Sequence, residues 1–133
     1  MELFLYISYG FLLYLQKHFV MRMQIKAGEL DRYIWTIKVI GLAKPPFTVL
    51  RQREIEVYAY LNMVYNKYAN LGEVEANSLT FSKKVKKEIC DHFGITMENF
   101  YNILVNLRRY GLIGEEELKV KIKPTDTINI VFL

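Results

Sequence analysis

Residues 82–111 read SKKVKKEICDHFGITMENFYNILVNLRRYG. Two short amphipathic helices fit this stretch, and they are separated at Gly94. Ser82 is suited to cap the first helix, over residues 83–92, because its hydroxyl can accept hydrogen bonds from first-turn amides. Thr96 is suited to cap the second helix in the same way. That helix ends at Gly111, a residue type that tolerates a left-handed position after a helix.

Apolar residues recur at helical spacing through both segments and predict one small core. They are Ile89, Phe93, Ile95, Phe100, Ile103, Leu104 and Leu107. Cys90 is the small residue at which the two helices would cross closely. The pattern resembles a helix-turn-helix, with Gly94 in the turn and with Phe100 and Ile103 facing inward from the second helix.

The resemblance extends to both sides of this stretch. On the upstream side, five residues resemble the opening of the first helix in LuxR-type DNA-binding domains: Leu50, Arg53, Glu54, Glu56 and Val57. On the downstream side, residues 110–113, YGLI, are similar to the segment in which the chain leaves the helix in winged-helix regulators. A hairpin would follow this segment. The long insert after the first helix and the strands after the third suit a winged helix better than the LuxR type.

The resemblance covers Thr48 to Leu133 and implies an α+β fold. We expect a winged helix-turn-helix domain over residues 48–133. An N-terminal apolar helix and a β-hairpin extension would precede it, over residues 1–47. The link Lys44-Pro45-Pro46 favours a boundary near this point, because proline lacks a backbone donor and keeps the residue before it extended.

The first residues are apolar from Leu3 to Leu15 apart from Ser8 and Gly10. This run is shorter than the ~20 residues of a comfortable membrane span. Glu2 stands where a secretion signal would carry a positive charge, and no small-residue cleavage site follows. We therefore expect a buried or partner-covered helix over residues 1–20 and no membrane anchor. Met21 and Met23 leave a downstream start open.

Several further elements are expected from local patterns. Residues 21–26 and 33–40 are expected to form two strands joined by a turn at residues 27–32, and the second of these segments is rich in β-formers. A long helix is expected from Thr48 to about Asn70, followed by a loop over residues 71–81 that closes with a short strand at 79–81. Residues 118–122 and 127–133 predict a second hairpin around the turn at 124–126.

Charge is distributed unevenly along the chain. The formal net charge is +4 and the pI is about 9.1, which permits a nucleic-acid partner. Residues 82–111 hold six basic and three acidic residues, hence +3, and residues 21–47 hold five and two, again +3. One cysteine and two histidines provide neither an intramolecular disulfide nor a zinc site. A reducing compartment is the default for such a chain, and we expect a cytoplasmic protein, with a virion as the alternative location.

Four lysines stand at the start of the first helix of the pair: Lys83, Lys84, Lys86 and Lys87. Cations at a helix start oppose the helix dipole. Free amides together with ammonium groups, however, form a natural phosphate site. Contact with a DNA backbone therefore explains the position of these lysines, and a solvated basic face is the alternative.

The second helix has a polar outer side that could read DNA. Asparagine can pair with adenine, and arginine with guanine, in the major groove. The candidate DNA-binding residues on this helix are Thr96, Asn99, Tyr101, Asn102, Asn106, Arg108 and Arg109. The alternative is protein contact through Tyr101, Val105 and the asparagines.

Lys119 and Lys121, with Lys123, alternate along the expected strand after the helix pair. In a wing they would follow the DNA backbone. The alternative is an exposed sheet edge that lysines protect from pairing. The run Glu115-Glu116-Glu117 is interpreted as a solvated loop, because no His or Asp accompanies it at metal-ligand spacing.

Catalysis finds no support in the sequence. Cys90, Asp91 and His92 are consecutive, so on a helix they point in different directions. There is no phosphate-binding loop and no dinucleotide fingerprint. We expect a non-enzyme without cofactor or metal.

Two functions remain open. The first is a regulator of transcription or replication that reads duplex DNA with residues 96–110. The second is a bacteriophage virion structural or assembly protein, such as a connector or packaging component, that uses the same fold for protein contacts. Ten tyrosines and eight phenylalanines favour a homo-oligomer or a larger assembly, because exposed aromatic side chains provide interface area.

Overall fold

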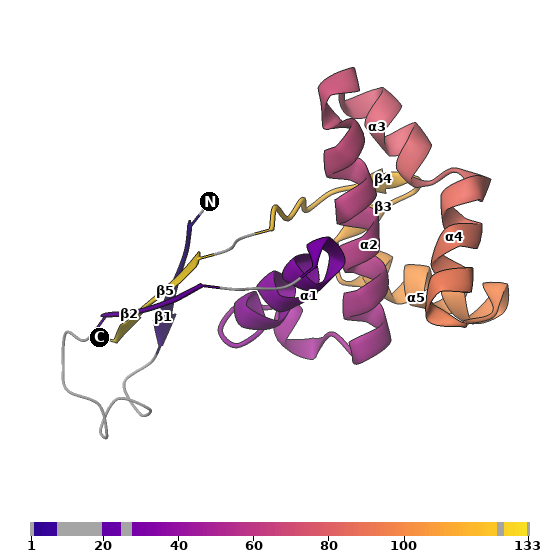
Figure 1. Cartoon of the computed structure of the whole chain (residues 1–133). Helices are drawn as coiled ribbons and strands as arrows, with labels where there is room; N and C mark the ends of the chain where they lie inside the picture. Colours follow the sequence, from indigo (N-terminus) through magenta and orange to yellow (C-terminus); the bar gives the residue numbers. More distant parts are fainter. Residues whose placement is uncertain (1, 8–19, 25–27, 125–126, 133) are drawn as a thin grey trace. The chain divides into compact units, whose positions relative to one another are not determined.

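The computed structural model describes residues 2–7, 20–24, 28–124 and 127–132 (Figure 1). The chain divides into two compact units. The first comprises Met1–Leu50 with Pro124–Leu133, and the second comprises Arg51–Lys123. Within the described residues, five α-helices accompany short β-sheets, so the fold is α+β.

The first unit contains a three-stranded sheet of β1 (Glu2–Ile7), β2 (Val20–Gln24) and β5 (Thr127–Phe132). The last strand in sequence, β5, is the central one (Figure 1). It pairs in parallel with β1, with Leu5 opposite Ile130, and antiparallel with β2, with Met23 opposite Ile128. The two ends of the chain are thereby joined in one sheet.

This sheet corrects two expectations and confirms two others. The N-terminal helix is wrong for Glu2–Ile7, because ELFLYI is rich in β-formers and finds its partner at the far end of the chain. Residues 8–19 lie outside the described residues. The strands expected at 21–26 and 127–133 are confirmed as β2 and β5 where described. The hairpin of 127–133 with 118–122 is wrong, since β5 pairs with β1 and β2.

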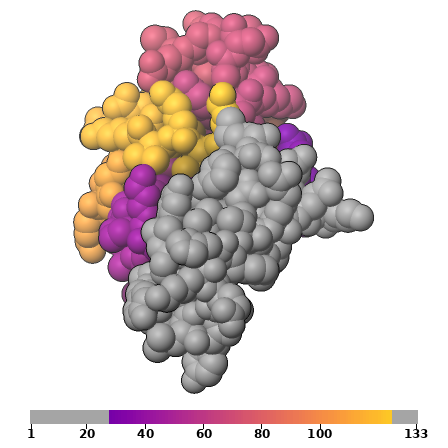
Figure 2. All heavy atoms as spheres, turned by 90° about the vertical axis from the view of Figure 1, so that its left-hand side faces the viewer, coloured from indigo at the N-terminus to yellow at the C-terminus, as the bar shows by residue number. Residues whose placement is uncertain are grey.

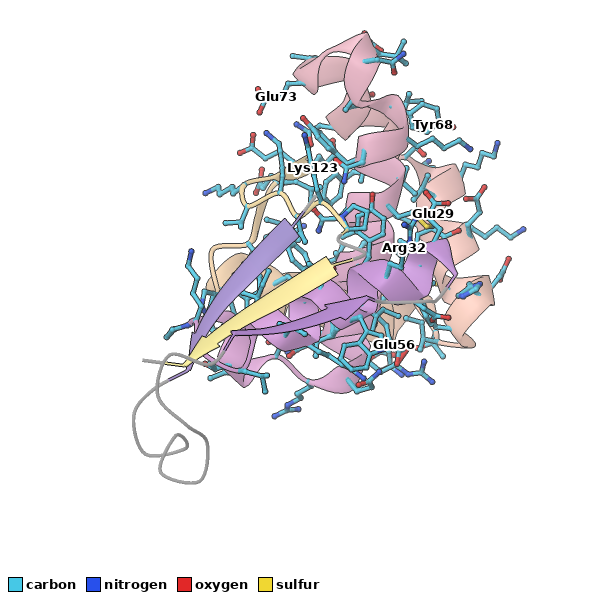
Figure 3. All side chains as sticks on the ribbon, turned by 60° about the vertical axis from the view of Figure 1, so that its left-hand side comes forward. Glu29, Arg32, Glu56, Tyr68, Glu73 and Lys123 are labelled. Carbon is cyan, nitrogen blue, oxygen red and sulfur yellow. The ribbon has the colours of Figure 1, made fainter. Side chains whose placement is uncertain are left out.

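The expected strand at 33–40 and the turn before it are wrong, because α1 (Glu29–Ile40) occupies this region. Glu29 and Asp31 in its first turn and Lys38 in its last turn complement the helix dipole. Tyr33, Thr36 and Ile37 are buried at helical spacing. Amphipathic periodicity therefore prevails over the β-propensity of individual residues. A short 3-10 helix, η2 (Phe47–Val49), follows, and Figure 3 labels Glu29 and Arg32 on α1.

The second unit is built on α2 (Gln52–Tyr68), which confirms most of the expected long helix. After the 3-10 helix η3 (Ala69–Leu71) comes α3 (Glu73–Thr80), so the expected loop over 71–81 and its strand at 79–81 are wrong. The helices α4 (Lys83–Phe93) and α5 (Met97–Arg109) follow. A minimal hairpin of β3 (Ile113–Gly114) and β4 (Glu117–Leu118) completes the unit.

The core of the second unit combines α2, α4, α5 and the hairpin. Tyr58, Leu61, Ile89, Phe100 and Leu107 are almost completely buried. The burial predicted for Phe100 and Leu107 is confirmed. The same prediction is wrong for three residues that keep partial exposure, namely Phe93, Ile95 and Ile103. The first two stand at the end of α4 and in the turn, where fewer neighbours surround them.

Residues 118–122, called here the anchored segment, are held largely by side chains of α2 and α3, although Leu118 at its start pairs with Ile113 of β3. Asn62 of α2 accepts from the Ile122 amide at 2.7 Å through Oδ1, and the Asn66 amide donates to the Ile122 carbonyl at 3.0 Å. The Tyr58 hydroxyl donates to the Val120 carbonyl. On α3, Asn77 accepts from the Leu118 amide at 3.1 Å. Figure 2 shows the yellow atoms of this part of the chain beside the pink atoms of α3.

These bonds explain why the strand expected over 118–122 is wrong beyond Leu118. A strand forms when another strand satisfies its backbone groups, whereas here asparagine and tyrosine side chains already do so. The amides of Lys119 and Val120 both donate to the Leu112 carbonyl, at 3.0 and 3.1 Å. Beyond Leu118 the segment is therefore fixed without forming a sheet.

Replacing Asn62 with Ala is expected to destabilise the protein by roughly 1–3 kcal/mol, the usual result of leaving a buried group without its partner. Asn62 is fully buried, and its amide also donates to the Tyr58 carbonyl at 2.9 Å. Urea unfolding measures the change. Asn70→Ala, at an exposed position of η3, is the matched control and should have little effect. Equal stability of both variants would contradict the anchoring role of Asn62.

Candidate nucleic-acid interface

Local capping signals position the α4–α5 pair as expected. The Ser82 hydroxyl accepts from the Val85 amide at 3.4 Å, and the Thr96 hydroxyl accepts from the Asn99 amide at 3.1 Å. Gly94 ends α4 in the left-handed region, at φ +64°. Gly111, at φ +78°, follows α5, and the next amide, that of Leu112, donates back to the Leu107 carbonyl at 3.1 Å.

The four lysines of α4 form what we call the lysine cluster: Lys83, Lys84, Lys86 and Lys87. Three are exposed and Lys86 is half-buried. Within the described part of the chain, none of them forms an ion pair. Their positive charges stand at the amino end of α4, where the helix dipole disfavours cations. An anion bound here would relieve this repulsion.

The lysine cluster borders α5 through one aromatic contact. The Lys86 ammonium lies 5.7 Å from the centre of the Tyr101 ring. Nearby, Cys90 Sγ lies 3.9 Å from Met97 Sδ, which places Cys90 at the approach of the two helices, as the sequence predicted. Burial raises the pKa of the Cys90 thiol, and the Asp91 carboxylate adds to this effect. Met97 and Tyr101 therefore lie on the side of α5 that faces α4.

The opposite side of α5 is tied to α2. The Asn106 amide donates to Glu54 Oε2 at 2.9 Å, and Glu54 Oε1 accepts from the Arg51 amide at 2.9 Å. Glu54 is only 3% exposed. One buried carboxylate thus joins the start of α2 to the last turn of α5. This contact commits the NH₂ group of Asn106, a candidate base reader, to holding the helix in place.

The outward face of α5 is the side opposite its buried residues Phe100, Leu104 and Leu107. At 3.6 residues per turn, this face consists of Glu98, Asn102, Val105 and Arg109. All four are exposed, and Asn99 is exposed beside them. The structure therefore brings Asn99, Asn102 and Arg109 to one accessible side of the helix.

Two further candidate DNA-binding residues, Arg108 and Lys119, lie beside the β3–β4 hairpin. Arg108 Nε donates to the carbonyl of Gly114 in the β3–β4 hairpin at 3.4 Å. The Lys119 side chain also reaches this hairpin, because a Cβ atom added to Gly114 would lie 2.9 Å from Lys119 Cε. The same Cβ would lie 2.7 Å from a Glu117 carboxylate oxygen, so this corner also carries negative charge. Glu115 and Glu116 form the exposed turn beside it, as expected of a solvated loop.

Lys121 is directed to another part of the unit. Its ammonium donates to Glu73 at the start of α3 at 2.9 Å and lies 5.2 Å from the centre of the Tyr65 ring (Figure 3 labels Glu73). The hydrogen bond to Glu73 raises the pKa of Lys121. The structure therefore does not bring Lys121 together with the residues of α5.

Two features were not expected from the sequence. The first is the Glu54–Asn106 contact, which joins residues too far apart in sequence for any local pattern to reveal. The second is a surface cluster in which the His92 ring centre lies 4.7 Å from that of Phe93 and 5.7 Å from that of Tyr60 on α2. Burial raises the pKa of the Tyr60 phenol, and the Glu88 carboxylate adds to this effect.

Two kinds of feature are absent from the described residues. None of the helices there is both long and apolar enough to span a membrane. No group of three or more His, Cys, Asp or Glu side chains in those same ranges is placed to hold a metal ion. In comparisons with known proteins, no protein-family model, no curated protein and no solved structure matches the chain.

Proposed function

We propose that the protein binds duplex DNA as a non-enzymatic regulator of transcription or replication. In this proposal α4 and α5 act as a helix-turn-helix, with α5 in the major groove and the β3–β4 hairpin as a short wing. The observation that carries it is the placement of the lysine cluster. Four cations without ion pairs among the described residues border a helix whose outward face holds exposed Asn102 and Arg109.

The two groups of residues would have different tasks. The lysine cluster would contact phosphates, which gives affinity for any sequence and a strong dependence on salt. Asn102 would pair with adenine and Arg109 with guanine, because these side chains can make two hydrogen bonds to those base edges. Glu98 on the same face can accept from the amino group of cytosine. Contacts to phosphates would thus position the helix on the DNA, and contacts to base edges would determine which sequence it binds.

Site selection from random duplexes tests this function, and Asn102→Ala is the decisive variant. The natural sequence should enrich a motif at physiological salt. In Asn102→Ala, discrimination at one base pair should fall by roughly 1–3 kcal/mol, while binding to random DNA stays nearly unchanged. Asn70→Ala, on η3 and far from α5 in the sequence, is the control and should keep the full preference for the selected site. Enrichment that survives Asn102→Ala unchanged would take base reading away from this residue.

A second candidate is a structural or assembly protein, and one observation favours it. Met97, Tyr101 and Val105 follow one another at every fourth position of α5 and are 41%, 47% and 47% exposed. Aromatic residues and methionine are enriched in protein interfaces. In that case no motif would be enriched, and the protein would co-purify with a multimeric partner. Asn102→Ala would then disturb this association instead of a DNA preference.

A further inference from the structure

Val105 is an apolar side chain in the middle of the outward face of α5. It is 47% exposed, with Asn102 three residues before it and Arg109 four residues after it. The other two exposed apolar residues of this helix have neighbours on α4. Met97 contacts Cys90, and Tyr101 lies under Lys86. Val105 is thus the apolar group that stands between the two polar side chains proposed to read bases.

The major groove presents one apolar group at the base edges, the 5-methyl group of thymine. We infer, on the basis of the proposed function, that Val105 contacts this methyl group and makes the protein prefer thymine to uracil at one position. Such a contact also favours DNA over RNA, since the major groove of an RNA duplex is too deep and narrow for side chains to read.

Helix geometry is consistent with one compact site. Asn102 and Arg109 are seven residues apart, which at about 1.5 Å per residue is roughly 10 Å along the helix axis. Successive base pairs are about 3.4 Å apart, so this distance corresponds to about three base pairs. The thymine contacted by Val105 should therefore lie within about three base pairs of the bases that Asn102 and Arg109 contact.

The test replaces thymidine by deoxyuridine, one position at a time, in the duplex obtained by site selection. This change removes only the methyl group. At one position the affinity should fall about fourfold, the result of losing about 0.8 kcal/mol for one buried methyl group. In Val105→Ala the ratio of the two affinities should fall to about one. Alanine has the higher helix propensity, so this variant should remain folded, which circular dichroism verifies.

Val74→Ala is the matched control, because Val74 is an 81% exposed valine on α3. This variant should keep the fourfold ratio. A selected duplex that binds equally well with deoxyuridine at every position would overturn the inference while leaving DNA binding in place. A ratio that persists in Val105→Ala would overturn it as well. If no duplex is selected at all, the proposed function itself fails.

Discussion

Replacing Phe100 with Ala is expected to lower the free energy of unfolding by about 3–5 kcal/mol, the usual range for truncating a buried phenylalanine. Phe100 is 0% exposed and faces inward from α5. Removing its ring leaves a cavity in a close-packed core, and the neighbouring backbone cannot close that cavity completely. Urea unfolding, followed by circular dichroism, measures the loss.

Tyr101→Ala is the control for this prediction, because it removes a ring of similar size from the next position of the same helix. Tyr101 is 47% exposed, so this variant should lose far less stability than Phe100→Ala. A domain of ordinary stability could be largely unfolded by the Phe100 change alone. Phe100→Leu keeps most of the volume and should give a smaller, measurable loss. Equal stability of Phe100→Ala and the natural sequence would contradict the packing described for α5.

Replacing Lys83, Lys84, Lys86 and Lys87 together with Gln is expected to weaken DNA binding for all sequences alike. If each lysine contacts one phosphate, the slope of log affinity against log salt should flatten by about 3.6, at about 0.9 per contact. Affinity at about 0.1 M salt should then fall by more than about a thousandfold. A titration of random and selected duplexes at several salt concentrations measures both quantities.

The control for this variant changes the same amount of charge elsewhere. Its four basic residues are exposed positions outside α4, α5 and the β3–β4 hairpin: Lys38, Lys44, Arg51 and Lys67. Replacing them with Gln should have a much smaller effect on the slope. If both variants behave alike, net charge and not the lysine cluster governs binding. An unchanged affinity and slope in the cluster variant would rule out the phosphate contacts.

The sequence predicted the α4–α5 pair well, because the signals for it are local. Ser82 and Thr96 stand directly before the helices that they cap, and Gly94 supplies the left-handed residue between them. Each signal acts within one helical turn, so a single sequence contains all that is needed. The set of candidate site residues follows from the same helices. Which of them come together on the outward face of α5 does not, as Asn106 and Lys121 show.

The failures arose where distant residues decide the structure. β1 pairs with β5 across almost the whole length of the chain, and no local pattern specifies such a partner. Asn106 points toward Glu54, and Lys121 toward Glu73, through contacts between separate elements. The error at α1 has a different cause. Its acidic first turn and the spacing of Tyr33, Thr36 and Ile37 indicate a helix, whereas its β-branched and aromatic composition favours a strand.

The anchored segment also has an evolutionary consequence. The bonds from Asn62, Asn66 and Asn77 reach only main-chain atoms of the residues that they hold. Every amino acid except proline offers the same main-chain groups. Substitutions at Lys119 and Val120, both exposed, therefore leave the anchoring bonds intact, whereas a change at Asn62 or Asn77 removes one. The surface formed by Lys119 and Val120 can therefore accumulate substitutions during evolution and acquire new contacts while the fold stays the same.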